Sequence, residues 1–100
     1  ASAAETHYVN VAPHNSNGPI STVASLHFAV STANAFKQEI FVSFLDRYRA
    51  VLTNDVPILD GFAIPPVGPG WGTDIDEDAL EEFPPTEYTP VESEPYVEFF

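Results

Sequence analysis

The chain has 100 residues, 44% of them hydrophobic, and a formal net charge of −12 from 15 acidic and three basic side chains. This length allows one small domain with a modest core, and the negative charge argues against nucleic acid and anionic membranes as partners. Cysteine is absent, which excludes disulfides and thiolate metal sites, and no apolar run is long enough for a transmembrane helix.

The first third of the chain predicts a strand followed by a helix. Ala1–Thr6 is typical of a frayed helix end, and His7–Ala12 has the β-branched and aromatic content of a short strand. After a polar loop, Gly18-Pro19 indicates a helix start. Apolar residues within Ile20–Ala33 cover most of the helix circumference, so we expect a helix buried between neighbours.

The next segments repeat this order. Ala35–Val42 predicts a second strand and Phe44–Leu52 a second helix. An order of strand, helix, strand and helix indicates a parallel sheet with right-handed crossovers. Because two parallel strands leave edges unpaired and faces uncovered, we expect this half to be a slice of a larger α/β protein.

The segment after the second helix is predicted to be less regular. Val56–Leu59 and Phe62–Ile64 are short extended stretches on either side of an Asp60-Gly61 turn. Pro65–Gly72 contains too many prolines and glycines for regular structure. We therefore expect turns and short strands here, with no long element.

The end of the chain is acidic. Thr73 or Asp76 is suited to cap a short helix reaching about Phe83. Beyond it, proline, glutamate and aromatic residues predict an irregular arm. Ten of the 15 acidic residues lie from Asp74 onward. This pattern is either a solvated acidic arm or the surface of a protein from a salt-rich cytoplasm, and the single lysine favours a halophilic source.

The start of the chain bears on its location. It has no initiator methionine, and no basic segment precedes an apolar stretch as in a secretory signal. We expect a cytoplasmic protein and a processed or truncated piece of a longer chain.

Four blocks of the chain resemble the C-terminal part of the enolase superfamily. They are Ala12-Pro-His-Asn-Ser-Asn-Gly-Pro19, Asn34-Ala-Phe-Lys-Gln-Glu39, Asp60-Gly-Phe-Ala-Ile-Pro65 and Gly68-Pro-Gly-Trp-Gly72. Each block alone is a weak signal, and their order makes the set fairly specific. Within the superfamily the resemblance is to the mandelate racemase group, closest to its acid-sugar dehydratases of the galactonate and gluconate type.

The resemblance implies an α/β fold: the C-terminal section of a modified (β/α)7β TIM-like barrel plus the returning segment of an α+β capping domain. Residues 1–52 would form the last strand-helix-strand units of the barrel, with His7–Ala12 as the seventh strand and Ala35–Phe41 as the eighth. Residues 53–83 would complete the capping domain, and residues 84–100 would form the acidic arm.

His14 and Glu39 are the candidate catalytic residues. From the residues alone, a histidine after a strand is more often a structural hydrogen-bonding group, although imidazole suits proton transfer near neutral pH. By resemblance, His14 would take the C2 proton of a sugar acid or protonate the departing 3-hydroxyl. Glu39 would hydrogen-bond a substrate carboxylate oxygen and share the developing charge with Mg²⁺.

Asn15 and Trp71 are the candidate substrate-binding residues. A turn role is an equal alternative for Asn15. For Trp71 the alternative is packing in the cap, since the family usually has a smaller aliphatic residue there. His7 is interpreted as a surface residue and His27 as a packing residue of the helix.

The resemblance implies Mg²⁺ as cofactor, with carboxylate ligands on earlier strands. We therefore expect no metal ligand in this chain, nor the acidic residue that orients the histidine, nor the second acid/base group. The acidic cluster near the end of the chain is interpreted as a solvated face. It comprises Asp76, Glu77, Asp78, Glu81 and Glu82.

The leading hypothesis is the C-terminal portion of a Mg²⁺-dependent sugar-acid dehydratase, a lyase that forms a 2-keto-3-deoxy acid. We expect the complete enzyme to be a homo-oligomer acting on a sugar acid, and the 100-residue piece alone to be inactive. The first alternative is a racemase or epimerase of the same superfamily. The second is a non-catalytic acidic module that binds a partner through its Phe- and Tyr-rich tail.

Overall fold

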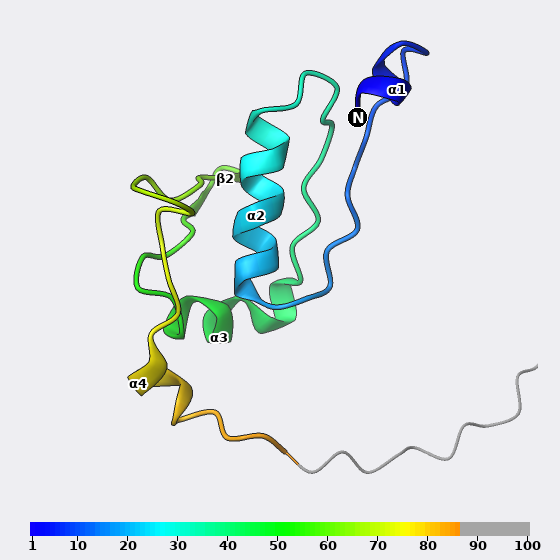
Figure 1. Cartoon of the computed structure of the whole chain (residues 1–100). Helices are drawn as coiled ribbons and strands as arrows, with labels where there is room; N and C mark the ends of the chain where they lie inside the picture. The colour runs from blue at the N-terminus through cyan, green and yellow to red at the C-terminus, as the bar shows by residue number, and fades with distance from the viewer. Residues whose placement is uncertain (87–100) are drawn as a thin grey trace, which may run out of the picture.

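The computed structural model describes residues 1–86, and residues 87–100 lie outside the described part. Helix α2 (Pro19–Val30) is the longest element, and it has extended chain on one side and a small hairpin on the other (Figure 1). The remaining elements are short: α1 (Ser2–Glu5), the 3-10 helix η1 (Val42–Phe44), α3 (Leu45–Ala50), β1 (Ile58–Leu59), β2 (Phe62–Ala63) and α4 (Glu77–Leu80).

Helix α2 begins where the sequence predicts and ends earlier. Gly18 is its N-cap and Pro19 its first residue, a position where the missing N–H of proline costs nothing. The helix ends at Val30 rather than Ala33, because the chain then turns back, with the Ala35 N–H bonded to the Thr32 carbonyl at 3.1 Å. This turn places the following segment alongside the one that precedes α2 (Figure 1).

The two predicted strands are reduced to one parallel bridge, between Val11 and Ala35. The Val11 N–H donates to Asn34 and the Phe36 N–H donates to Val11, at 2.9 and 3.0 Å. The predicted parallel direction is confirmed, but the predicted strand lengths are wrong, since a ladder extends only as far as paired neighbours allow.

The predicted strand start at His7 is also wrong. His7 and Tyr8 belong to the turn that closes α1, where their N–H groups bond to the carbonyls of Ala4 and Glu5. Tyr8 has a φ of 57°, a left-handed conformation that a strand residue does not adopt. The extended chain therefore starts only after this turn.

The helix predicted over Phe44–Leu52 starts earlier as η1 and continues as α3. Helix α3 runs across the end of α2 at which α2 begins (Figure 1). The Tyr48 hydroxyl donates to the Asn17 carbonyl at 2.6 Å. This bond ties α3 to the loop that leads into α2, which is also the loop that follows His14.

From β1 onward, the predicted turn and the predicted helix cap are confirmed. Asp60 and Gly61 have φ values of 50° and 82°, as in the two-residue turns that suit the twist of a hairpin, and they join β1 to β2 in antiparallel pairing. Asp76 rather than Thr73 caps α4, accepting a hydrogen bond from the Ala79 N–H at 3.1 Å. The helix ends at Leu80, short of Phe83.

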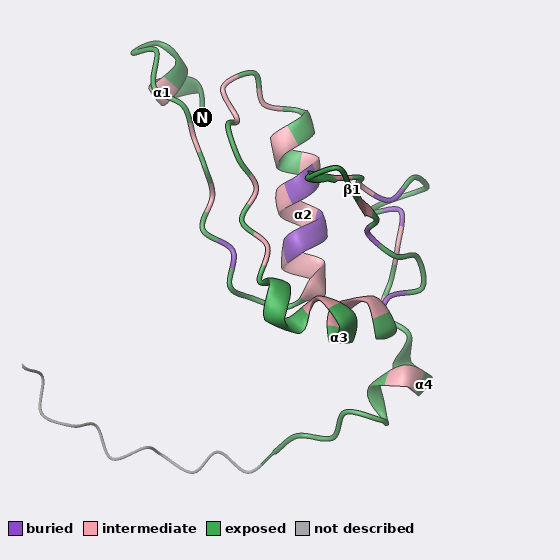
Figure 2. Cartoon of the chain, turned by 180° about the vertical axis from the view of Figure 1, so that it is seen from behind, coloured by how far each residue is buried: buried purple, intermediate pink, exposed green. Residues whose placement is uncertain are grey.

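The core is small and lies on one face of α2 (Figure 2). Its buried members are Val23, Leu26, Leu52 and Val56, with Ile20, Ala63 and Ile75 packed against them. Among the described residues α2 is not covered on all sides, since Phe28 and Val30 are 37% and 67% exposed, and its burial between neighbours stays a prediction. Within residues 1–86, no helix is long and apolar enough to cross a membrane.

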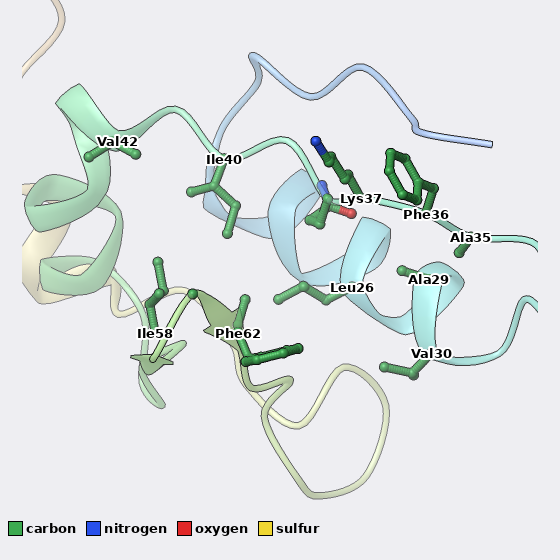
Figure 3. Close-up of a pocket in the computed structure, with 13 residues that line it drawn as sticks. Leu26, Ala29, Val30, Ala35, Phe36, Lys37, Ile40, Val42, Ile58 and Phe62 are labelled. Carbon is green, nitrogen blue, oxygen red and sulfur yellow. The ribbon is translucent and has the colours of Figure 1, made fainter. Parts of the chain in front are cut away.

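An apolar hollow of about 600 Å³ separates α2 from the hairpin (Figure 3). The segment after Ala35 forms its third wall, through residues that include Gln38 and Ile40. Phe36 and Phe62 also line it, although they are 63% and 73% exposed. Of the four predicted site residues, none lines this hollow.

Candidate active site

The parallel bridge brings together the two ends that carry the predicted catalytic residues. His14 follows Val11 by three residues, and Glu39 follows Ala35 by four. Extended segments leaving a parallel bridge advance at nearly equal rates, so the two side chains emerge as neighbours. The His14 Nδ1 atom lies 2.7 Å from Glu39 Oε2.

The charge state of this pair follows from its hydrogen bonds. The pKa of Glu39 is held below its usual range, chiefly by the Asn15 backbone N–H and further by His14, against an opposing effect of desolvation. An ionised carboxylate only accepts hydrogen bonds, so His14 Nδ1 carries a proton and donates it to Oε2. In the neutral imidazole the other ring nitrogen, Nε2, is then the acceptor, and the Ser16 hydroxyl lies 3.2 Å from it.

This arrangement is that of an oriented base. The side chain of His14 is 78% exposed, so Nε2 is open to a proton that comes from outside the chain. A carboxylate on the opposite nitrogen fixes the tautomer and stabilises the imidazolium that forms when Nε2 takes a proton. Orientation of His14 by Glu39 departs from the sequence expectation, in which the orienting acid lies outside this chain.

The Asn15 side chain does not line an open site. It is 1% exposed, and its amide bonds to Thr22, Ser21 and the backbone carbonyl of Glu39, at 2.9, 2.9 and 3.1 Å. Both amide hydrogens and the carbonyl oxygen are therefore engaged within the chain, and a substrate-binding role for Asn15 stays a prediction.

Trp71 lies apart from the histidine–glutamate pair. Its backbone carbonyl accepts a hydrogen bond from His27 Nε2 at 3.0 Å, and the two rings have centroids 5.8 Å apart. Among residues 1–86, no hydrogen bond joins Trp71 to His14 or Glu39. A substrate-binding role for Trp71 stays a prediction.

The described residues do not fit a metal ion. In residues 1–86, no group of three or more His, Asp or Glu side chains is arranged to hold one. Near α4, the Asp76 carboxylate caps the helix. The Glu39 carboxylate is already bonded to His14 and to the Asn15 N–H. No catalytic step is therefore assigned to a metal held by these residues.

Sequence reasoning missed the residues that support the pair. Ser16, Ser21 and Thr22 all take part in its hydrogen-bond network. For Ser16 the sequence indicates only a turn. At the start of α2 the apolar residues are the more obvious feature of the sequence, and the hydroxyl residues beside them are easily overlooked. Hydroxyl residues at Ser21 and Thr22, six and seven positions after a polar loop residue, were the available signal.

Comparison with known proteins gives the family. Residues 1–79 match a family model described as enolase C-terminal domain-like. The chain is 33% identical over 81 residues to the D-xylonate dehydratase of Haloferax volcanii, which covers 81% of this chain and 20% of that protein. It is 33% identical over 86 residues to a D-mannonate dehydratase of Caulobacter sp. strain K31, covering 84% and 21%. The chain thus spans about a fifth of the length of these curated relatives.

Solved structures agree with this likeness. An enolase of the mandelate racemase subgroup from Agrobacterium tumefaciens has a TM-score of 0.70 and 32% identity, over 81% of this chain and 21% of that one. A Burkholderia xenovorans protein described as an L-alanine-DL-glutamate epimerase, bound to magnesium and fumarate, has a TM-score of 0.71 and 32% identity, over 86% and 21%. The fold is therefore an α/β fragment of TIM-barrel type.

Proposed function

Since this chain belongs to the enolase superfamily, within its mandelate racemase group, we propose that it is the C-terminal portion of a sugar-acid dehydratase. Two relatives with dehydratase names support this substrate class. In this proposal the segments that carry His14 and Glu39 are the last two strands of a (β/α)7β barrel, and residues 53–83 return to a capping domain.

One observation carries the proposal: the bond between His14 Nδ1 and Glu39 Oε2. It leaves Nε2 of His14 free of Glu39, on a side chain that is mostly exposed. A proton α to a carboxylate is weakly acidic, so its removal needs a base held at one position and one tautomer. Glu39 supplies that constraint and a negative charge to balance the imidazolium.

The proposed reaction is an elimination. His14 Nε2 takes the C2 proton, and the electron pair of the C–H bond enters an enediolate. The 3-hydroxyl then leaves as water, taking the proton that His14 now carries, and the resulting enol becomes a 2-keto-3-deoxy acid by moving its hydroxyl proton to C3. Ser16 must release Nε2 before the proton is taken, because its hydroxyl lies 3.2 Å from that atom.

The proposed cofactor is Mg²⁺, held by parts of the full-length enzyme other than the described residues. When bound, a divalent cation stabilises negative charge on the substrate carboxylate. The contribution of this chain is separate: an oriented base and its carboxylate partner.

An epimerase is the second candidate. A structural neighbour described as an L-alanine-DL-glutamate epimerase is as similar in fold as the enolase above. An epimerase and a dehydratase share the removal of the α-proton, so His14 and Glu39 serve either equally. They differ in the second step, since an epimerase returns a proton to C2 and a dehydratase loses the hydroxyl at C3.

The test uses His14→Asn in the full-length protein, with His7→Asn as the matched control on an exposed turn. A panel of sugar acids is assayed in D₂O for 2-keto-3-deoxy acid and for deuterium at C2. We expect the wild-type protein and the His7 variant to form the keto acid. The His14 variant should lose about 10³-fold or more in kcat, the upper part of the range for a general base.

Other outcomes separate the candidates. Deuterium at C2 with no keto acid would assign the epimerase. Full activity in the His14 variant would remove His14 from the chemistry altogether.

A further inference from the structure

We propose that Asn15 is a positioning residue that holds Glu39 in the orientation it needs to bind His14. Its effect on turnover rests on the function proposed above, whereas its effect on Glu39 is measurable without any substrate. Substrate contact by the Asn15 side chain is the competing role.

Burial is the first argument. The Asn15 side chain is 1% exposed, and it is among the largest fully buried side chains of the described residues. A buried amide costs free energy unless its polar atoms are bonded. Here Nδ2 donates to Thr22 Oγ1 at 2.9 Å and to the Glu39 carbonyl at 3.1 Å, and Oδ1 accepts from Ser21 Oγ at 2.9 Å. The amide is satisfied within the chain.

The second argument is that Asn15 forms two hydrogen bonds with Glu39, one to its main chain and one to its carboxylate. Its side chain holds the backbone carbonyl of Glu39, and its backbone N–H donates to Glu39 Oε2 at 2.6 Å. The same oxygen accepts the bond from His14. Main chain and carboxylate of Glu39 are therefore both fixed relative to the residue that follows His14.

The third argument is that the hydrogen-bond partners of the Asn15 side chain lie on a helix. Thr22 is 4% exposed and, like Ser21, lies in the first turns of α2, the longest helix of the chain. A side chain bonded to a helix is held more rigidly than one bonded to a loop. Asn15 thus connects Glu39 to the rigid helix α2. Glu39 itself lies on an extended segment that has a single backbone bridge.

The test compares substitutions at Thr22. Thr22→Val has a similar shape and cannot bond to the Asn15 amide, whereas Thr22→Ser keeps the hydroxyl. Asn15→Ala removes the whole side chain. Each is made in the full-length protein, and the carboxyl carbon of Glu39 is followed through a pH titration by NMR of ¹³C-labelled glutamate, with the resonance assigned by its absence in Glu39→Gln.

We expect the pKa of Glu39 to rise toward its usual range in Thr22→Val and Asn15→Ala, and to stay at the wild-type value in Thr22→Ser. In turnover, kcat should fall about fivefold in Thr22→Val, as for loss of a hydrogen bond of about 1 kcal/mol. KM should change less than kcat, because the substrate contacts are intact.

Unchanged titration of Glu39 in Thr22→Val would overturn the proposal, even if Asn15→Ala fails to fold. A higher KM with normal kcat and normal titration in Asn15→Ala would assign direct substrate binding instead. A shifted titration in a protein that turns over no sugar acid would support the positioning role and refute the proposed function.

Discussion

His27 on α2 and Trp71 in the loop after β2 are joined by a hydrogen bond from Nε2 to the backbone carbonyl oxygen and by close packing of their rings. The contact ties the proline- and glycine-rich segment to the longest helix. Trp71 is the only tryptophan among these 100 residues, so within them its fluorescence reports on the surroundings of this contact.

We predict that His27→Leu loosens this loop. Leucine fills similar space and cannot donate to the Trp71 carbonyl, so the indole should become more accessible to iodide or acrylamide. His7→Leu, on the exposed turn after α1, is the control and should leave quenching unchanged. Equal quenching in the two variants would show that the hydrogen bond does not hold the loop.

Gly72 is predicted to be irreplaceable in the same loop. A Cβ at this position would lie 2.6 Å from the Pro66 carbonyl oxygen, and its φ is +72°. Gly70 has a φ of +62° with nothing within 4 Å, so Gly70→Ala measures the backbone cost alone, about 1 kcal/mol. Gly72→Ala should lower the free energy of unfolding by clearly more than Gly70→Ala, as measured in urea.

Leu26→Ala should destabilise the core strongly. Leu26 is 3% exposed and packs in the cluster with Val23, Leu52 and Val56. Truncation of a buried leucine costs about 2–5 kcal/mol. Val67→Ala is the control, because Val67 is 94% exposed and should change the free energy of unfolding by no more than about 0.5 kcal/mol. Similar values for the two variants would show that this cluster is not the core.

The pKa of Glu39 makes a prediction about acid. Because the folded state holds this pKa below its usual range, the carboxylate adds stability above the usual pKa and loses it as the pH falls through the folded pKa. Wild type should therefore unfold at higher urea than Glu39→Gln at neutral pH. The difference should shrink at acid pH, and a difference that stays constant with pH would contradict the assignment.

Salt should stabilise the protein. A net charge of −12 on 100 residues creates self-repulsion that mobile ions screen, over about 10 Å at 0.1 M and about 3 Å at 1 M. We expect Tm to rise between these KCl concentrations. The double variant Glu81→Gln/Glu82→Gln, on exposed positions after α4, should have a smaller rise, and a Tm that does not rise with KCl would refute the effect.

The local elements were predictable because a few adjacent residues determine them. The Asp60-Gly61 turn needs only two residues that tolerate positive φ, and the cap at Asp76 needs one carboxylate before an N–H. The start of α2 at Pro19 is of the same kind. Each depends on contacts within a few residues.

Elements that depend on distant partners were predicted less well. The side chains of His7–Ala12 are typical of a strand, but only Val11 has a paired neighbour among the described residues. The buried Asn15 amide bonds to Ser21 and Thr22, and these partners were not predicted. His14 and Glu39 were predicted as one site through a resemblance, and their direct contact was not predicted.

The bridge between Val11 and Ala35 has a consequence for how this site can vary. Over residues 38–40 the side chains alternate as in extended chain: Gln38 and Ile40 line the apolar hollow, and Glu39 between them bonds to His14. Inserting one residue between Ala35 and Glu39 would turn the carboxylate toward the hollow and leave His14 without it. An insertion or deletion between Ala35 and Glu39 should therefore disturb the pair more than a substitution at residues 36–38.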